Sequence, residues 1–214
     1  MLTNIVRDLD LDEEAMFMDF EHKVRKNVKK AQRNNVQIVL DSTGERLDEY
    51  LDIYEHTMSR RQASERYYFP RSYYESIHEH LAGQFIYFHA LHEGRVISTE
   101  LVLISAENVY SFLGGTSDDA FDLRPNDLLK CEIINWARTE GKRRFILGGG
   151  YHVDDGVYRY KLAFAPHGIM PFDVGRRILN PQLYDQFVAN KARLRQGHGM
   201  HWSPAPNFFP AYRA

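Results

Sequence analysis

A single lysine, Lys161, interrupts an apolar face of a short predicted helix. Over Gly156–Phe164 the helical spacing places Val157, Tyr160 and Phe164 on the same face as this lysine. An ammonium group held there could stabilise a developing oxyanion or bind a substrate phosphate. The structural alternative is a lysine whose aliphatic stem lies along the apolar surface while its amine reaches water. Lys161 is therefore the first candidate for a catalytic residue.

Further candidates lie close to this helix in the sequence or in the preceding strands. Gly149 and Gly150 follow a predicted strand and would let the backbone approach a ligand closely. Asp155 immediately precedes the helix and could act as a general base, or cap the helix N-terminus. Tyr110 and Tyr158 could donate hydrogen bonds to a substrate, although core packing is an equal alternative for each.

Two basic clusters could bind phosphate or carboxylate groups. The first follows a predicted helix and contains Arg60, Arg61 and Arg66, whose guanidinium groups suit a diphosphate or a carboxylate. The second lies on the polar faces of an N-terminal helix and includes Lys26, Lys29 and Lys30. The alternative for both clusters is a solvated surface. We expect the two clusters to form one electropositive rim.

The sequence favours neither a metal site nor a catalytic thiol. His198 and His201 lack accompanying cysteine or acidic ligands, and His152 is a loop histidine without an evident partner. The one cysteine, Cys131, lies inside a predicted helix, so no disulfide can form within the chain. This cysteine usage favours a reducing compartment.

Composition indicates a folded domain of ordinary size. The chain has 214 residues, of which 43% are hydrophobic, and its net charge is −2. These values favour one large domain or one domain with appendages, and they argue against a general polyanion binder. There is no run of about 18 apolar residues and no basic-then-apolar leader. We therefore expect a soluble cytoplasmic protein without a transmembrane segment.

Hydrophobic periodicity predicts a mixed α/β fold in which an antiparallel meander precedes crossover helices. The expected domains are an acidic then basic amphipathic helix (1–35), a catalytic domain (36–194) and an irregular tail rich in Gly, His and Pro (195–214). The expected elements are a helix bearing Phe17 to Ala31, a strand at 36–40, helices at 45–61 and 70–82, strands at 84–91, 95–103 and 108–115, a helix from Pro125 to Gly141, a strand at 143–147, the Lys161 helix, a strand at 169–174 and a helix at 182–194.

This order, together with the motifs Tyr110–Ser117, Pro125–Ala137, Phe145–Gly149 and Gly156–Phe164, resembles the FemABX branch of the GNAT acyltransferase superfamily. The resemblance implies a GNAT-like fold and amide-forming transfer, as in enzymes of peptidoglycan and cell wall biosynthesis. It implies an aminoacyl-tRNA donor, a nucleotide- or lipid-linked muropeptide acceptor and no further cofactor. It also maps a functional lysine onto Lys161 and places the acceptor phosphate near the Arg60–Arg66 cluster.

The chain departs from that pattern in two respects. Family members carry two GNAT-like domains with substrate at their junction, whereas this chain is long enough for one. A homodimer, a partner subunit or the rest of a longer two-domain chain could supply the other wall, or the substrate differs. The aromatic residues Tyr67–Phe69 and Trp202–Tyr212 are candidate contact surfaces, and the alternative is that the tail folds back over its own domain. The glycine that usually follows the lysine helix is replaced by Ala165.

Two alternatives remain from the sequence. One is an acyl-CoA-dependent N-acyltransferase acting on a small amine or amino sugar, and the other is a non-catalytic GNAT-like binding module. The loop Thr116–Arg124 disfavours CoA because it has no glycine and contains three aspartates, which would repel a diphosphate.

Overall fold

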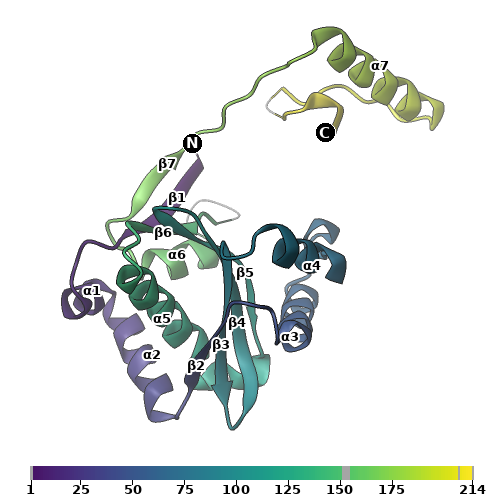
Figure 1. Cartoon of the computed structure of the whole chain (residues 1–214). Helices are drawn as coiled ribbons and strands as arrows, with labels where there is room; N and C mark the ends of the chain where they lie inside the picture. Colours follow the sequence, from purple (N-terminus) through teal and green to yellow (C-terminus); the bar gives the residue numbers. More distant parts are fainter. Residues whose placement is uncertain (1, 151–154, 207, 214) are drawn as a thin grey trace. The chain divides into compact units, whose positions relative to one another are not determined.

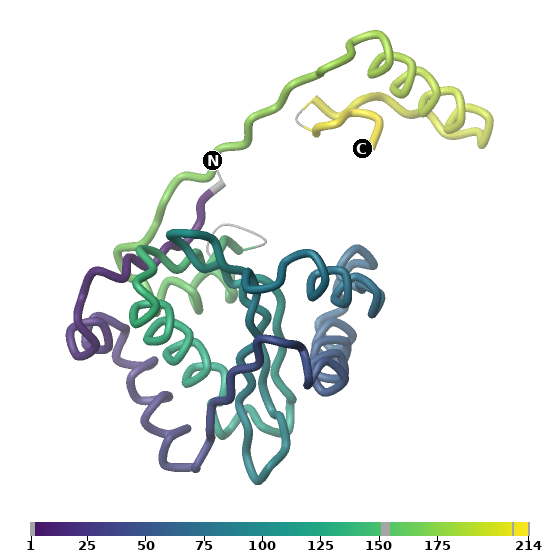
Figure 2. Tube along the Cα trace, viewed as in Figure 1, coloured from purple at the N-terminus to yellow at the C-terminus, as the bar shows by residue number. Residues whose placement is uncertain are grey.

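A computed structural model describes residues 2–150, 155–206 and 208–213. The chain divides into two compact units, Met1–Phe172 and Asp173–Ala214. The first unit contains one seven-stranded sheet with helices on both of its faces (Figure 1). The second unit consists of a helix and an irregular segment that folds back along it (Figure 2).

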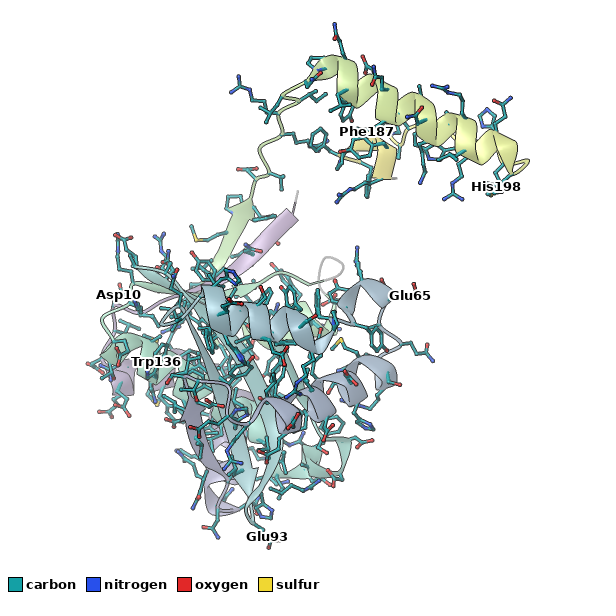
Figure 3. All side chains as sticks on the ribbon, turned by 45° about the vertical axis from the view of Figure 1, so that its right-hand side comes forward. Asp10, Glu65, Glu93, Trp136, Phe187 and His198 are labelled. Atoms are coloured by element: carbon teal, nitrogen blue, oxygen red, sulfur yellow. The ribbon has the colours of Figure 1, made fainter. Side chains whose placement is uncertain are left out.

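The sheet is mixed, with one parallel pair of strands. The strands follow the order β2-β3-β4-β5-β6-β1-β7, and the single parallel pair is β5 with β6. The predicted meander is confirmed as β3, β4 and β5, and Glu93 marks the turn between its first two strands (Figure 3). The strands are β1 (Leu2–Asp8), β2 (Gln37–Asp41), β3 (Phe85–His92), β4 (Arg95–Ile104), β5 (Asn108–Thr116), β6 (Arg144–Gly148) and β7 (Ile169–Phe172).

The helices divide between the two faces and build two separate cores. The larger core packs one face of the sheet against α1 (Glu13–Asp19), α2 (His22–Arg33), α5 (Pro125–Thr139) and α6 (Gly156–Leu162). The smaller core covers the other face with α3 (Leu47–Arg60) and α4 (Arg71–His80), which are joined through the short helix η1 (Glu65–Tyr67). A second short helix, η2 (Asp118–Leu123), connects β5 to α5.

The N-terminal region differs from the expected single helix. Strand β1 was not expected, and the helix breaks between α1 and α2, where Phe20 adopts an extended conformation with ψ of 149°. The Glu21 N–H donates to the Ala163 carbonyl at 2.9 Å, and the Phe20 ring packs on Phe164 at 5.4 Å between centroids. These long-range contacts override the local helical pattern.

The unit boundary also differs from the expected domain limits of 36 and 194. Elements α1, α2 and β1 belong to the same core as the sheet, while α7 (Pro181–Gly197) belongs to the second unit. The apolar side chains Leu183, Phe187 and Leu194 of this helix are exposed. Within the second unit, the Tyr184 ring stacks on Phe209 and contacts Tyr212. Part of the expected tail therefore packs on α7.

The connection from β2 into α3 depends on one carboxylate, that of Asp41. It accepts hydrogen bonds from the backbone N–H groups of Thr43, Gly44 and Arg46 at 2.7–3.0 Å. Burial raises its pKa, but these hydrogen bonds outweigh burial and lower the pKa to about 2. The carboxylate therefore stabilises the fold fully above the pKa of an unfolded aspartate, and this contribution is lost as the pH falls toward 2.

Replacing Asp41 with asparagine should reduce the free energy of unfolding at pH 7 by about 2 kcal/mol, because the charged acceptor is removed from three backbone donors. Urea denaturation would measure the change, and the gap from wild type should narrow as the pH falls from about 4 toward 2. The neighbouring exposed Ser42 offers a matched control, since Ser42→Ala should stay within about 0.5 kcal/mol of wild type. An equal decrease in the free energy of unfolding in both variants would contradict the role given to the Asp41 carboxylate.

Candidate functional site

Strands β5 and β6 pair over a short distance and then separate. Their parallel register joins Asn108–Tyr110 to Arg144–Ile146, whereas β5 continues to Thr116 along β4. The β4–β5 register also shifts, since Val102 lies opposite Ser111 and Leu101 opposite Leu113, which leaves Phe112 as an extra residue in β5. Such a bulge leaves backbone groups outside the regular ladder. The edge of β5 after Tyr110 therefore offers backbone donors and acceptors that no described strand pairs.

Lys161 reaches the end of β6 from helix α6. Its Nζ donates to the Gly149 carbonyl at 2.8 Å. The chain turns there because Gly148 has φ of +80°, a conformation that favours glycine. A Cβ at that position would lie 3.3 Å from Nζ. The amine therefore lies at the end of β6, beyond the last residue of this strand that pairs with β5.

The electrostatic surroundings disfavour the charged form of Lys161. Burial, followed by the positive charge of Lys130, lowers the pKa of the Lys161 amine to about 8, while Glu100 and Asp155 oppose that shift. Near neutral pH both the ammonium and the free amine are then populated. The group can accept a proton and return it, which an ordinary surface lysine does far less readily.

A buried network of three polar side chains lies beside it. Lys130 of α5 forms an ion pair with Glu100 of β4, and the exposed fractions of these side chains are only 5% and 6%. Lys130 Nζ also donates to Ser111 Oγ at 3.2 Å, and that hydroxyl donates to Glu100 Oε1 at 2.6 Å. The network thus ties β4, β5 and α5 together next to the bulge.

Sequence reasoning missed this network, although the sequence contains a signal for it. Glu100 stands in the middle of a strongly apolar strand, and Lys130 stands between Leu129 and Ile133 in the most apolar helix. Two opposite charges, each at a position that apolar spacing assigns to the interior, indicate a buried pair.

The first turn of α5 carries a buried carboxylate. Asp127 accepts a hydrogen bond from Asn27 Nδ2 at 3.2 Å, and burial raises its pKa. Nearby, the Tyr160 hydroxyl donates to the Asn126 carbonyl at 3.2 Å. Burial, aided by the carboxylates of Asp127 and Glu100, raises the pKa of Tyr160, so the hydroxyl stays protonated.

The sequence-predicted residues around Lys161 occupy different surroundings. Asp155 accepts from the Tyr158 N–H at 2.7 Å and caps α6, while the Tyr158 side chain is buried in the larger core. A Cβ on Gly149 would lie 2.7 Å from the Thr3 carbonyl, and one on Gly150 would lie 2.6 Å from Asp155 Oδ1. The two glycines thus allow close packing within the chain itself. Their roles toward a substrate stay predictions.

Tyr110 does not join the lysine network. It is the last β5 residue paired with β6, and its side chain is 36% exposed. Side chains alternate along a strand, so Tyr110 points to the face opposite its neighbour Ser111, which contacts Lys130. Within the part of the chain that the structure describes, no contact supports its predicted catalytic role, which stays a prediction.

The arginine cluster lies at the end of α3. Arg60 Nη2 donates to the Thr116 carbonyl at 3.1 Å, and its guanidinium stacks over the Phe121 ring at 4.6 Å. Arg66 stacks over the Tyr67 ring, and Arg61 is exposed. Arg60 therefore links α3 to the end of β5, close to the connection that leads into α5.

The N-terminal basic cluster forms a stripe along α2. A shallow groove of about 600 Å³ runs along this helix between side chains that include Arg25, Lys26 and Lys29, whereas Lys30 is partly buried outside it. Helix α2 packs with α5 on one face of the sheet, and α3 covers the other (Figure 1). The expectation of one shared rim with the Arg60–Arg66 cluster is therefore wrong, because the sheet separates them.

The remaining candidates from the sequence are Cys131 and the histidines. Burial, with smaller effects of Glu132 and Glu13, raises the pKa of the Cys131 thiol to about 12. Within the described ranges no three His, Cys, Asp or Glu side chains gather to hold a metal ion. His152 lies outside the described residues. None of the described helices has the length and apolarity needed to span a membrane.

Comparisons with known proteins give a family and a fold. The family described as "Acetyltransferase (GNAT) domain" matches residues 18–162. No curated protein matches the chain. Among solved structures, FemX superposes with a TM-score of 0.67 at 15% identity, covering 78% of this chain and 58% of FemX. This chain therefore spans little more than half the length of FemX.

Two other solved structures share the fold at similarly low identity. The C-terminal domain of a putative lysylphosphatidylglycerol synthetase from Agrobacterium fabrum has a TM-score of 0.55 at 14% identity and covers 76% of this chain and 56% of that one. An aminoglycoside acetyltransferase from an uncultured soil metagenomic sample has a TM-score of 0.52 at 13% identity, covering 68% of this chain and 97% of that one.

Proposed function

Since the chain belongs to the GNAT acetyltransferase domain family and is thus an acyltransferase, we propose that it moves an aminoacyl group onto an amine and forms an amide bond. The observation that carries this proposal is Lys161, an amine with a pKa of about 8 held at the separation of β5 and β6. The fold shared with FemX supports the choice of an aminoacyl group.

The proposed reaction is aminolysis of an ester. The acceptor nitrogen attacks the acyl carbon, the new C–N bond forms, and the bond from that carbon to the leaving oxygen breaks. The proton lost by the amine passes to the leaving oxygen, and Lys161 can carry it because it gains and loses a proton readily near neutral pH. Backbone N–H groups on the unpaired edge of β5 can donate to the oxyanion.

The start of α5 favours an ester of tRNA over acyl-CoA as the donor. A helix N-terminus binds pyrophosphate through free N–H groups and its positive end. Here Pro125 lacks an N–H, and the buried carboxylate of Asp127 lies in the first turn. The preceding η2 carries Asp118 and Asp119, although His56 contacts the former and Arg95 pairs with the latter. A diphosphate would therefore gain little binding free energy at the N-terminus of α5.

The acceptor in this proposal is a nucleotide- or lipid-linked muropeptide. Arg60, Arg61 and Arg66 would meet its phosphate or carboxylate groups on the α3 side of the sheet, where their guanidinium groups suit such anions. In this proposal a second copy or a partner subunit contributes to the acceptor site. The cytoplasm would supply the aminoacyl-tRNA.

Thermal shift measurements with three ligands can test the donor and the acceptor, since a ligand that binds the native state raises its stability. Uncharged tRNA and a nucleotide-linked muropeptide should each raise the melting temperature, and acetyl-CoA should not. Stabilisation by acetyl-CoA alone would instead support an acyl-CoA-dependent N-acyltransferase. Stabilisation by the muropeptide with no amide product from aminoacyl-tRNA would support a binding module.

Lys161→Met should lower kcat by about 100- to 10,000-fold, which is the usual range for losing a proton-transferring group. The melting temperature should stay within a few degrees of wild type, because methionine fills the same apolar surroundings without a charge. Lys161→Arg is the informative companion, since arginine keeps the charge and cannot release its proton. Equal decreases in kcat in Lys161→Met and Lys161→Arg would support proton transfer by Lys161. Substantial turnover in Lys161→Met would show that Lys161 is not needed for the reaction.

The stripe on α2 should contact the phosphates of the tRNA donor. Lys26→Gln combined with Lys29→Gln should raise KM for aminoacyl-tRNA and reduce the slope of log affinity against log salt by about 1.5. Lys191→Gln in the second unit removes one charge elsewhere and serves as the control. If all variants bind tRNA with the wild-type salt dependence, the stripe has no role in donor binding.

A further inference from the structure

We propose that the second unit, Asp173–Ala214, binds an anionic phospholipid surface and so attaches the protein to a membrane without crossing it. The attachment itself does not depend on the proposed function. Its consequence does rest on that function, because attachment would bring a lipid-linked acceptor within reach of the enzyme.

The second unit is basic, although the chain as a whole is slightly acidic. It contains six arginine and lysine residues and two aspartates, which give a net charge of +4. The whole chain has a net charge of −2, so the first unit carries −6. Each lysine or arginine close to an anionic membrane increases the affinity roughly fivefold. The charge that suits anionic headgroups is therefore concentrated in this one unit.

The second unit leaves its apolar side chains in water. None of its described residues, 173–206 and 208–213, is buried. Leu179 is 85% exposed and Leu194 is 65% exposed. A segment of about 40 residues without a core gains little from folding alone, and clustered exposed apolar side chains mark a binding surface. Another surface is therefore expected to cover them.

Helix α7 presents apolar and basic side chains in an order that suits a flat anionic surface. Three exposed apolar side chains form a stripe along it: Leu183, Phe187 and Leu194. At about 100° per residue, the three lie within roughly 40° of one another around the helix. The same spacing places Lys191 and Arg195 on one side of this apolar stripe and Arg193 on the other. Asp185, the one acidic residue of α7, lies about 180° from the middle of the stripe.

This arrangement is typical of helices that lie in a membrane interface. Their apolar side chains enter the boundary between headgroups and acyl chains, while flanking lysine and arginine side chains extend to the phosphates. The far side of α7 stays available to the rest of the unit. Tyr184 donates from its hydroxyl side of the helix to no lipid in this arrangement, because its oxygen accepts from the Ala211 N–H at 2.9 Å and its ring stacks on Phe209.

The aliphatic character of the stripe favours a lipid surface over two other partners. An RNA would be bound through cations and aromatic rings, and leucine side chains gain little from a phosphate backbone. A second copy of the chain, whose first unit is acidic, would have to offer the stripe an apolar groove. The two grooves described on the first unit are lined mainly by charged side chains, and the one along α2 is basic.

Sedimentation of the full chain with vesicles tests the proposal. The wild type should sediment with vesicles of phosphatidylcholine and phosphatidylglycerol, stay in solution with pure phosphatidylcholine, and be released as salt is raised. Arg193→Gln combined with Arg195→Gln should weaken binding to the anionic vesicles by roughly 25-fold, about fivefold for each charge. Leu183→Gln should weaken it roughly tenfold, because this side chain no longer gains from leaving water.

Two matched controls accompany these variants. Leu40 and Leu183 are both 45% exposed, but Leu40 lies on β2 of the first unit, so Leu40→Gln should bind vesicles like the wild type. Asp185→Asn changes a charge on the opposite side of α7 and should not weaken binding. The altered side chains lie on the surface, so the melting temperature should stay within a few degrees of wild type in every variant.

Each other outcome would overturn the proposal. Wild-type vesicle binding in both the arginine variant and Leu183→Gln would show that this surface does not contact lipid. A dimer of the wild type in light scattering that Leu183→Gln dissociates, without vesicle binding, would assign the stripe to a second copy. Loss of tRNA affinity in the arginine variant, again without vesicle binding, would assign the unit to RNA.

A transfer assay separates this inference from the proposed function. The arginine variant and Leu183→Gln should keep wild-type kcat/KM toward a nucleotide-linked acceptor in solution and lose activity toward a lipid-linked acceptor in anionic vesicles. If no variant and no wild type transfers an aminoacyl group to either acceptor, the proposed function fails. The vesicle measurements decide the attachment in either case.

Discussion

The separation of β5 from β6 is the constraint on which the rest of the site depends. Two parallel strands that stayed paired would satisfy each other's backbone groups and leave no space for a substrate between them. Here the pairing stops at Tyr110, and each strand then needs other support. Strand β5 obtains it from β4 and the lysine–glutamate network, and β6 ends in a glycine turn that contacts Lys161.

Polar groups are concentrated where this separation opens the core. Glu100, Lys130, Ser111 and Asp127 are all substantially buried, yet each has a hydrogen-bond partner. The smaller core on the other face is built very differently, from stacked and edge-on tyrosine rings such as Tyr50, Tyr54 and Tyr74. The face of the sheet that α5 covers thus contains buried charged and polar groups, while the face covered by α3 and α4 is stabilised mainly by aromatic packing.

The sequence predicted the fold well because its signals were local. Proline at the start of α5, the glycine after it and the aromatic and β-branched strands of the meander place these elements within a few residues of their observed limits. Strand β1 was not found in this way, since its partners lie more than a hundred residues later. The break at Phe20 depends likewise on the distant residues Ala163 and Phe164.

The site was predicted only in part, for a related reason. Lys161 stood out as one charge on an apolar helix. Glu100 and Lys130 each carry a similar local signal, but the sequence spacing does not tell that β4 and α5 bring these two side chains together. The shared basic rim failed because sequence spacing does not tell which face of a sheet a helix covers.

The place of β1 in the sheet has a consequence for synthesis on the ribosome. Strand β1 lies between β6 and β7, so the ribosome synthesises both of its neighbours more than a hundred residues after it. At ~5–20 residues per second, β1 waits on the order of 10 to 30 s before either partner exists. The meander and α3 can associate in that interval, whereas the turn that contacts Lys161 cannot be anchored to β1. Nascent chains of this protein should therefore form the aromatic core before the turn that contacts Lys161 can be anchored to β1.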